Sequence, residues 1–308
     1  MNEGAFIDVG KSGIRLQTVV DGVFRTYFGE GLSPTQSGNH GAALGRNIES
    51  LLAEAAIPPP EHLVIGSTGE LTPTELHSLF TVLGRAIPEA VVALTDDGTL
   101  AHARFLNAPG TVLCVGTGVI AIARSLAGEL RRFDGWGPLA GDRGSAVEVG
   151  RSALRSAHRA VDEGRSSELR DCVATRLGAV DLTAARAVLS DPRWPATLAG
   201  LALGVCELAD AGVAEAAVIL DAAATELHQT TRCAVAAAGV PGVVITGRFG
   251  TAAALRSRLE ALFHSDGIRM LAPLPEQSVA AAEIMTGPYG PSMTFARAGQ
   301  GFAFEGGH

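Results

Sequence analysis

The sequence has few aromatic residues, few cysteines and no long apolar segment. Phe, Trp and Tyr make up 5% of its 308 residues, and alanine and valine fill much of the apolar pattern instead. The cysteines are widely spaced and form no CxxC pair, which argues against a disulfide framework or a zinc site and favours buried thiols. They are Cys114, Cys172, Cys206 and Cys233. No stretch of about 18 apolar residues lacks charges and helix breakers, so we expect no membrane span.

Basic clusters are missing as well. The formal net charge is -8, and Lys and Arg are scattered, so nucleic-acid binding has no electrostatic basis here. The segment Met1–Phe6 has neither the basic nor the apolar region of a signal peptide. These features favour an acidic cytoplasmic enzyme with no nucleic-acid or membrane partner.

The sequence is rich in apolar residues, at 47%, and it has 38 glycines. Its length and apolar content suggest two lobes with substantial cores and many tight turns. The first third reads as three strands followed by alternating helices and strands, with one of these helices over Pro73–Ala86, and a strand-rich pattern restarts after Pro109. We therefore expect an N-terminal lobe over 1–107 and a C-terminal lobe over 108–308.

Each predicted lobe begins with three strands, of which the first two are joined by a tight turn. In the first lobe Asp21-Gly22 separates the second and third strands, which is a strong hairpin signal. The second lobe continues into a helical region over 145–237, and the glycine-rich tail over 287–308 has no clear assignment. The expected strands that define this repeat are Gly4–Val9, Ile14–Val20 and Val23–Phe28, and then Thr111–Val115, Val119–Arg124 and Glu129–Phe133. The pattern predicts an α/β fold with duplicated mixed sheets flanked by helices.

The turn Asp8–Gly13 lies between two predicted strands. Backbone N–H groups in such a turn can form an anion-binding nest, and Asp8 could hold a water-coordinated Mg²⁺ beside phosphates. A P-loop is disfavoured because Ala5 stands where its first glycine belongs and no helix follows. An ordinary hairpin turn explains the segment equally well.

A second turn, Gly116–Gly118, also joins two apolar strands. Its glycines and Thr117 would allow close approach to phosphate oxygens. The segment Gly116–Ala121 fits the dinucleotide pattern GxGxxA, but this match is weak because no helix and no downstream ribose-binding acid are evident.

Three further segments could carry chemistry. Asp96 follows an apolar strand and precedes a helix, where a carboxylate can act as general base; alternatively it is a helix N-cap, although Asp97 could supply the cap instead. In the glycine-rich loop Gly135–Ser145, Asp142 could accept hydrogen bonds from sugar hydroxyls, or the loop is a plain connection. Gly247 would let the backbone pass close to an adenine or ribose, or mark a common strand-to-helix turn.

Together these segments resemble the N-acetylglucosamine kinase group of the BadF/BadG/BcrA/BcrD ATPase family, within the superfamily of actin, hexokinase and the Hsp70 chaperones. That group has DGGGTKT at its first phosphate loop, TDA or NDA at its catalytic aspartate and GTGS at its second phosphate loop. Its longest motif is GGWGxxxGDEGSAYxxG. The matching residues here are, in order, Asp8–Ile14, Thr95–Asp97, Gly116–Val119 and Asp134–Gly150.

The resemblance implies a two-lobed actin-like ATPase (ribonuclease H-like) fold, dimerisation, and ATP-dependent phosphorylation of an amino sugar. The sugar would be N-acetylglucosamine or glucosamine, phosphorylated at O6, with ATP and Mg²⁺ as cofactors. Asp96 would be the base, and Asp8 would hold Mg²⁺ through water. The phosphate and nucleotide contacts would be Gly10, Lys11, Ser12, Gly13, Thr117, Gly118 and Gly247. The sugar contacts would be Thr68, Gly69, Asp96, Thr117, Gly135, Trp136 and Asp142.

Three positions depart from the family pattern. Lys11 replaces a glycine and could add charge at the phosphates, Val119 replaces a serine, and Arg143 replaces a glutamate and could change the sugar that fits or pair with Asp142. Two other functions remain open. One is an ATPase that activates a reductase or dehydratase through an iron–sulfur cluster, and the other is a non-catalytic sugar-sensing protein.

Overall fold

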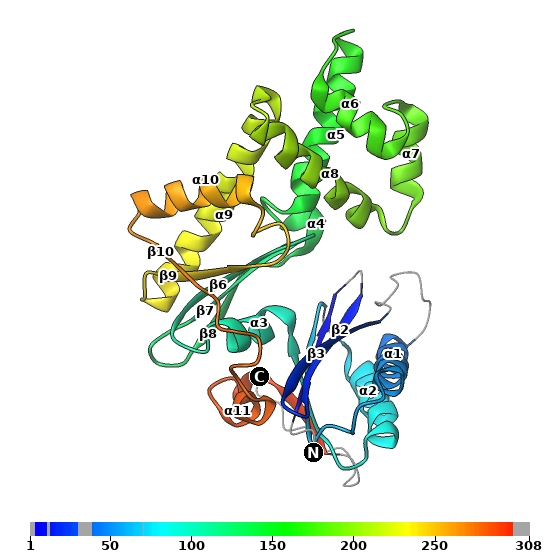
Figure 1. The fold of residues 1–308 in the computed structure, drawn as a ribbon, viewed down its shortest axis with the longest axis vertical. Coiled ribbons are helices and arrows are strands. Elements are labelled where there is room, and N and C mark those ends of the chain that lie inside the picture. The colour runs from blue at the N-terminus through cyan, green and yellow to red at the C-terminus, as the bar shows by residue number, and fades with distance from the viewer. Residues whose placement is uncertain (1–3, 11–12, 30–38, 70, 298–308) are drawn as a thin grey trace. The chain divides into compact units, whose positions relative to one another are not determined.

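The computed structural model describes residues 4–10, 13–29, 39–69 and 71–297, and these form two compact units (Figure 1). The chain leaves the first unit after Asn107 and returns to it at Leu274, so that the second unit is Ala108–Pro273. The sequence predicted one C-terminal lobe over 108–308 instead. The difference arises because residues after Pro273 add a helix and an edge strand to the first unit.

The first unit is built on a six-stranded mixed sheet with the order β11–β5–β4–β1–β2–β3. Strands β1 to β3 form an antiparallel meander, β4 and β5 run parallel to β1, and β11 pairs antiparallel with β5 at the edge. Their bounds are β1 Ala5–Val9, β2 Ile14–Val20, β3 Val23–Gly29, β4 His62–Ser67, β5 Val91–Asp96 and β11 Thr294–Arg297.

The helices of the first unit divide between the two faces of this sheet. Two helices, α1 (His40–Ala55) and α2 (Pro73–Ala86), lie side by side in Figure 1 and share one apolar core with the strands. The helix α3 (Asp97–Phe105) packs against β4 and β5, and α11 (Ala281–Thr286) and a 3₁₀ turn (Gly290–Ser292) follow the return of the chain. Helix α2 begins where the sequence predicts, because Thr72 and Glu75 form a capping box around Pro73.

The second unit contains a five-stranded mixed sheet with the order β10–β9–β6–β7–β8. Strands β6 to β8 are antiparallel neighbours, and β9 and β10 run parallel to β6. Their bounds are β6 Gly110–Val115, β7 Val119–Arg124, β8 Leu130–Asp134, β9 Gly242–Thr246 and β10 Arg269–Leu271.

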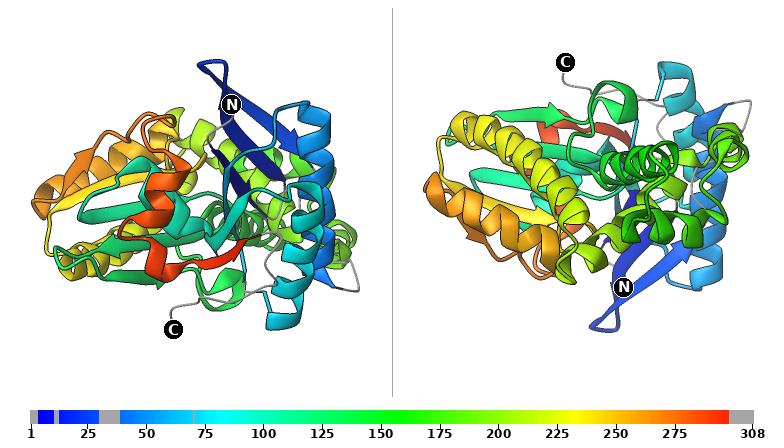
Figure 2. Two further views of the ribbon diagram at one scale, coloured as in Figure 1. Left: turned by 90° about the horizontal axis from the view of Figure 1, so that it is seen from below. Right: turned by 90° about the horizontal axis from the view of Figure 1, so that it is seen from above.

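Seven helices of the second unit lie within its described residues, and five of them occupy the stretch predicted only as a helical region. The long helix α9 runs across the sheet (Figure 2) and contacts β6, β7 and β8. The bounds are α4 Gly137–Ala140, α5 Ala146–Asp162, α6 Glu168–Leu177, α7 Leu182–Ser190, α8 Trp194–Asp210, α9 Ala214–Ala238 and α10 Ala253–Ser265. Helices α5, α8, α9 and α10 together bury the core of this unit.

The two sheets have the same topology. The strands β5–β4–β1–β2–β3 of the first unit correspond in order and direction to β10–β9–β6–β7–β8 of the second. The prediction of an α/β fold with duplicated mixed sheets is therefore confirmed, and the topology is that of the actin-like ATPase fold. The equivalence also shows that the turns 10–13 and 116–118 occupy the same position, between the first and second strands of each unit.

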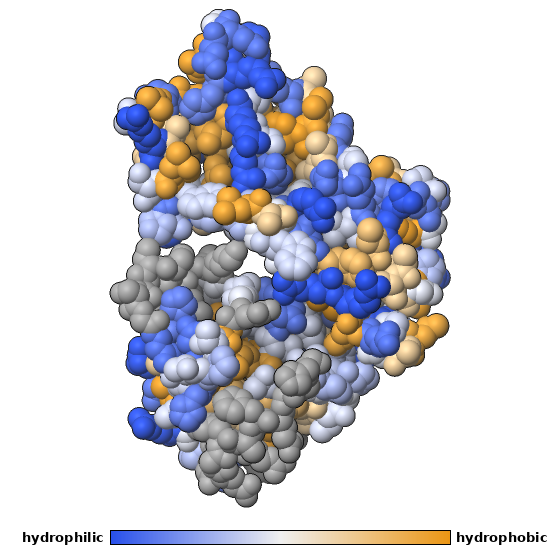
Figure 3. All heavy atoms as spheres, turned by 180° about the vertical axis from the view of Figure 1, so that it is seen from behind, coloured by the Kyte–Doolittle hydropathy of each residue, from blue (hydrophilic) through white to orange (hydrophobic). Residues whose placement is uncertain are grey.

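The described surface is mixed in character. On the face drawn in Figure 3, hydrophobic and hydrophilic residues are interspersed. The large exposed apolar side chains come from different elements, among them Phe28 of β3, Leu139 of α4 and Leu189 of α7. Within the described part of the chain, none of the helices has both the length and the apolar character that crossing a membrane requires.

Candidate functional site

In the first unit, the strand register brings three of the predicted segments to one edge of the sheet. Asp8 of β1 pairs with Gly66 of β4, and Ser67 pairs with Asp96 of β5. A Cβ atom at Gly66 would lie 2.7 Å from the Leu100 side chain, so α3 can approach β4 closely only because this residue is glycine. The carboxyl ends of these parallel strands thus hold Asp8 and Asp96 close to the first turn of α3.

Asp96 is the N-cap of α3. Its Oδ1 accepts a hydrogen bond from the Thr99 amide at 2.8 Å, and its Oδ2 accepts one from Thr99 Oγ1 at 2.5 Å. Of the two aspartates that the sequence offered as the cap, the structure therefore uses Asp96 and not Asp97. Capping does not exclude a role in catalysis, because a carboxylate has about four lone-pair sites and the hydrogen bonds from the described residues use two of them.

Asp97 is a second carboxylate in the same turn, and the sequence did not single it out as a site residue. Its Oδ1 accepts the Gly98 amide at 2.9 Å. Burial, and after it the negative charges of Asp96 and Asp8, raise the pKa of Asp97 to about 6. The two consecutive aspartates at a strand end were the only signal in the sequence, and burial could not be deduced from it.

The first predicted phosphate turn is described only at its two ends, where the Gly10 amide donates to the Gly13 carbonyl at 2.9 Å. Lys11 and Ser12 lie outside the described residues. Thr68 closes the neighbouring strand end, because both its amide and its hydroxyl donate to the Val9 carbonyl at 3.1 Å. Toward a ligand, the Thr68 hydroxyl would therefore act as an acceptor.

Gly69, which was predicted with Thr68, has a left-handed backbone with φ of 89°. Among the described residues other than its chain neighbours, no heavy atom lies within 4 Å of a Cβ atom built at Gly69. The residue is therefore glycine for its conformation and not for lack of space, which leaves room for a ligand beside it.

Asp8 forms an ion pair with Arg15, with 3.0 Å between Oδ2 and Nη2. Mg²⁺ typically takes one or two carboxylates and fills its remaining positions with water and phosphate oxygens. Within the described residues, no three His, Cys, Asp or Glu side chains gather into a metal site. The donor set therefore fits an ion held by Asp8 through water and by phosphates better than an ion enclosed by protein ligands.

In the second unit, the turn Gly116–Gly118 faces the beginning of α5. The carbonyl oxygens of Gly116 and Thr117 accept from the amides of Ala146 and Val147, at 3.1 and 3.4 Å. The peptide bonds of the described residues are trans, so each carbonyl points opposite to the next N–H group. The N–H groups of Thr117 and Gly118 consequently point away from α5, which suits contact with an anion.

Asp142 joins this turn to the glycine-rich loop. Its Oδ1 accepts the Val119 amide at 3.0 Å, and the residue is 6% exposed. A Cβ atom at Gly118 would lie 2.6 Å from the same oxygen. The structure thus brings Asp142, predicted to bind the sugar, against Gly118, predicted to bind phosphate. It also gives Asp142 a hydrogen bond within the protein that the sequence did not predict.

Asp134, the last residue of β8, organises the loop, and the sequence did not indicate it as a site residue. Its buried carboxylate accepts from the Asp142 amide at 2.8 Å, the Arg143 amide at 3.3 Å and Arg143 Nε at 3.1 Å. Of the two alternatives for Arg143, pairing with Asp142 is thus replaced by pairing with Asp134. An aspartate at a strand end is too common for sequence reasoning to distinguish this role.

The remaining predicted loop residues lie on the surface of the second unit. Gly135 has a φ of 74°, and Trp136 is 68% exposed. The Arg132 guanidinium lies 5.5 Å from the centre of the Trp136 ring, and its Nη2 donates to the Gly135 carbonyl at 3.3 Å. Arg132 thereby fixes the indole as an exposed aromatic face.

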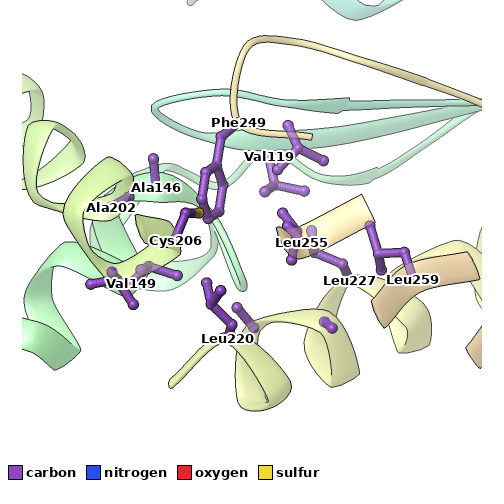
Figure 4. Close-up of a cluster of buried hydrophobic side chains, with 14 of the residues drawn as sticks. Val119, Ala146, Val149, Ala202, Cys206, Leu220, Leu227, Phe249, Leu255 and Leu259 are labelled. Atoms are coloured by element: carbon purple, nitrogen blue, oxygen red, sulfur yellow. The ribbon is translucent and has the colours of Figure 1, made fainter. Parts of the chain in front are cut away.

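Gly247 lies against the end of β6, directly before the second phosphate turn. Its φ is 87°, and a Cβ atom there would lie 2.4 Å from the Val115 carbonyl oxygen. The next residues anchor this turn: the amides of Phe249 and Gly250 donate to the same oxygen, and the Phe249 ring points into the core near Val119 and Cys206 (Figure 4). Gly247 is thus brought next to the turn that begins at Gly116, which is 131 residues earlier in the sequence.

The predicted residues accordingly form two groups, one in each unit. The first contains Asp8, Gly10, Gly13, Thr68, Gly69 and Asp96, and the second contains Thr117, Gly118, Gly135, Trp136, Asp142 and Gly247. Both groups lie at the carboxyl ends of parallel strands or in the loops next to them, which is where α/β sheets bind ligands.

Solved structures share this fold. A protein from Chromobacterium violaceum assigned as an N-acetylglucosamine kinase is 24% identical, with a TM-score of 0.66 over 88% of this chain and 94% of that chain. A second so assigned, from Porphyromonas gingivalis, is 16% identical, with a TM-score of 0.69 over 87% and 94%. A ROK family glucokinase from Streptomyces griseus, solved with glucose and AMPPNP, is 14% identical, with a TM-score of 0.54 over 87% and 93%.

The family assignment comes from the sequence itself. None of the curated proteins matches it. The model of the BadF/BadG/BcrA/BcrD ATPase family matches residues 81–283, a segment that holds Asp96, both glycine-rich loops of the second unit and Gly247. Since this match spans more than half of the chain, the chain belongs to the BadF/BadG/BcrA/BcrD ATPase family.

Proposed function

We propose that this protein is an ATP-dependent kinase that phosphorylates a hydroxyl group of an amino sugar. The observation that carries the proposal is the position of Asp96, at the carboxyl end of β5 and at the N-cap of α3. A carboxylate there can accept the proton of an attacking hydroxyl. Membership of an ATPase family and the similarity in fold to proteins assigned as sugar kinases support the same reaction.

The proposed reaction assigns a role to residues in each unit. ATP would supply the phosphoryl group, and Mg²⁺ would offset the charge of its phosphates. The N–H groups of Thr117 and Gly118 would bind phosphate oxygens, as would the turn 10–13. Gly247 would pass close to the nucleotide, and Asp8 would hold the ion through water.

The proposed sugar is N-acetylglucosamine or glucosamine, phosphorylated at O6. The polar contacts would come from Asp142 and from Thr68 beside Gly69. Gly135 and Trp136 would contribute the loop surface, and an exposed indole suits the apolar face of a pyranose ring. Arg143 adds little positive charge to this surface, because its guanidinium is paired with Asp134.

A phosphorylation screen tests the proposal directly. The purified protein is incubated with Mg-ATP and N-acetylglucosamine, glucosamine, N-acetylmannosamine or glucose, and products are identified by mass spectrometry and by NMR of the phosphorylated carbon. We expect an amino sugar to be phosphorylated at O6. Failure of every sugar to raise ATP consumption above its rate without sugar would contradict the proposal, and binding of a sugar without turnover would favour a sensing protein.

The alternative of an ATPase that activates a reductase receives little support. An iron–sulfur cluster shared between subunits needs cysteines at an exposed surface, and the four cysteines lie in β6, α6, α8 and α9, with Cys206 buried and Cys233 exposed. The homodimer implied by the family resemblance remains part of the proposal, and sedimentation velocity would test it.

A further inference from the structure

On the face of the first sheet that lies away from α1 and α2, strands β1 and β2 carry a set of polar side chains. Its register places Phe6 beside Gln17 and Asp8 beside Arg15, whereas the alternate residues Ile7 and Leu16 belong to the core shared with α1 and α2. Successive side chains of a strand point to opposite faces, so the polar set lies on the side away from that core. A buried polar set has to be fully paired to be stable.

Arg104 of α3 is the most buried charged member of this polar set, at 2% exposure. Its Nη1 donates to Gln17 Oε1 at 2.5 Å and its Nη2 to the Glu276 carbonyl at 3.1 Å. The guanidinium also lies 4.5 Å from the centre of the Phe6 ring. Burial lowers the pKa of Arg104 to about 10, so the side chain still carries its charge at neutral pH.

Glu276 links Arg104 to β2, the strand that carries Arg15, which is the ion-pair partner of Asp8. Its Oε2 accepts from Gln17 Nε2, and its Oε1 lies 3.7 Å from Arg15 Nη1. Gln17 therefore stands between a carboxylate and a guanidinium, with its amide nitrogen toward the first and its amide oxygen toward the second. Only in this orientation do the Gln17 amide nitrogen and Arg104 Nη1 each face an acceptor, because the opposite orientation would place the amide nitrogen against the guanidinium.

The row Asp8–Arg15–Glu276–Gln17–Arg104 thus ends at two candidate functional elements. At one end Arg15 holds the Asp8 carboxylate, and at the other Arg104 holds α3, whose first turn carries Asp96. Glu276 is supplied by the segment that returns from the second unit, and the Leu274 amide of that segment donates to the Phe105 carbonyl at 2.8 Å. The returning segment is therefore also hydrogen-bonded to the C-terminal end of α3.

We propose that Glu276 is a positioning residue that sets the placement of Asp8 and Asp96 for phosphoryl transfer, an inference that rests on the proposed kinase function. Glu276 offers two acceptor oxygens where two donors, Arg15 and Gln17, converge. A glutamine at 276 offers one acceptor and one donor, so one contact of the row is mismatched. The mismatch either releases Arg15 and Asp8 or turns the Gln17 amide, which then presents a donor to Arg104.

The test compares Glu276→Gln with Glu283→Gln, the same substitution in the same returning segment. Glu283 is exposed and accepts from Asn107 Nδ2 at 3.0 Å, beyond the C-terminal end of α3, without contact to the row. We expect Glu276→Gln to lower kcat roughly 10- to 100-fold with little change in either KM, because misplaced reacting groups cost rate more than binding. Glu283→Gln should retain the kcat of the wild type.

A double exchange provides a rescue. In Gln17→Glu with Glu276→Gln, the new carboxylate at 17 accepts from Arg104 and from the amide nitrogen at 276, while the amide oxygen at 276 accepts from Arg15. The contacts of residues 17 and 276 with Arg15, with Arg104 and with each other then each pair a donor with an acceptor again, and the total charge is unchanged. We expect kcat to recover most of its loss in this variant, which a general loss of stability would not produce.

Amide hydrogen exchange at Thr99, whose N–H is bound by Asp96, gives a readout that does not need a sugar. We expect several-fold faster exchange in Glu276→Gln and no change in Glu283→Gln. Wild-type exchange at Thr99 in Glu276→Gln, or a kcat equal to that of the wild type, overturns the positioning role. If the wild type phosphorylates no sugar, the proposed function fails, while the exchange at Thr99 still decides whether Glu276 positions α3.

Discussion

Asp97 follows Asp96 directly in the first turn of α3, yet the two carboxylates have different environments. Both oxygens of Asp96 accept hydrogen bonds from Thr99, whereas Asp97 is bound through one oxygen to the Gly98 amide. Burial and the charge of Asp96 raise the pKa of Asp97 to about 6. The unit therefore holds a capping carboxylate beside one that gains a proton just below neutral pH.

We predict that Asp97→Asn stabilises the first unit at neutral pH. The folded state keeps the Asp97 proton up to about pH 6, whereas the unfolded state loses it near 3.8, so stability falls as pH rises between these values. Above pH 6 the full penalty of about 3 kcal/mol applies, at about 1.4 kcal/mol per unit of pKa shift. Urea unfolding at pH 7 should show the variant to be more stable, and the difference should close below pH 4.

Asp21→Asn is the control for this prediction, because it removes an exposed charge from the β2–β3 turn of the same unit. Its stability relative to the wild type should not depend on pH in this way. A gap between Asp97→Asn and the wild type that stays constant from pH 4 to pH 7 would contradict the raised pKa.

The general base should be Asp96 and not Asp97. General-base catalysis typically contributes about 10²–10⁴-fold, so Asp96→Asn should lower kcat by that factor. Asparagine is also a good N-cap, and its amide oxygen can still accept from the Thr99 amide, so folding should survive. Asp97→Asn should lower kcat less than tenfold. Steady-state kinetics on the true substrate decide between them, and the reverse order of effects would assign the base to Asp97.

The two glycines of the second phosphate turn should respond differently to alanine. A Cβ atom at Gly118 would lie 2.6 Å from Asp142 Oδ1, whereas one at Gly116 would have no heavy atom of the described residues within 4 Å, its chain neighbours aside. Gly118→Ala should therefore lower the melting temperature. Gly116→Ala should melt like the wild type but bind ATP more weakly, because phosphate would need the space that the methyl group fills. Calorimetric titration with ATP measures this, and unchanged affinity would place the phosphates elsewhere.

Two substitutions of Asp142 should separate the effect of its hydrogen bond to the Val119 amide from the effect of its charge. Asp142→Ala leaves the buried Val119 amide without its acceptor, which costs about 1–3 kcal/mol. Asp142→Asn keeps an acceptor oxygen for Val119, so its stability should be closer to that of the wild type, while sugar affinity falls in both variants. Thermal unfolding and sugar titration check the two effects. Equal loss of stability in both variants would show that the charge itself holds the loop.

Local sequence signals predict much of the fold. The bounds of α2, Pro73–Ala86, were predicted without error, because Pro73 follows a capping threonine and the helix ends at a short connection. The same holds for β2, where Asp21-Gly22 forces the turn that ends the strand. Strand β11 was not predicted, since it has four residues and its partner β5 lies about 200 positions earlier in the chain.

The candidate site was predictable where motifs are contiguous and not where partners are distant. Asp96 and Asp142 stand in recognisable motifs, and their strand-end and loop positions are as the sequence indicates. The burial of Asp97, the hydrogen bonds to Asp134 and the contact of Gln17 with Glu276 depend on how remote segments pack, and no local pattern encodes them.

The return of the chain at Leu274 also fixes an order of events during synthesis. The second unit is continuous and is complete once Pro273 has left the ribosome, whereas the first unit still lacks its edge strand and Glu276 at that moment. At about 5–20 residues per second, roughly 10–30 s separate the emergence of Asn107 from that of Leu274. The half of the protein that is translated first is therefore the half that matures last, and its unpaired β5 edge needs protection from aggregation in the interval.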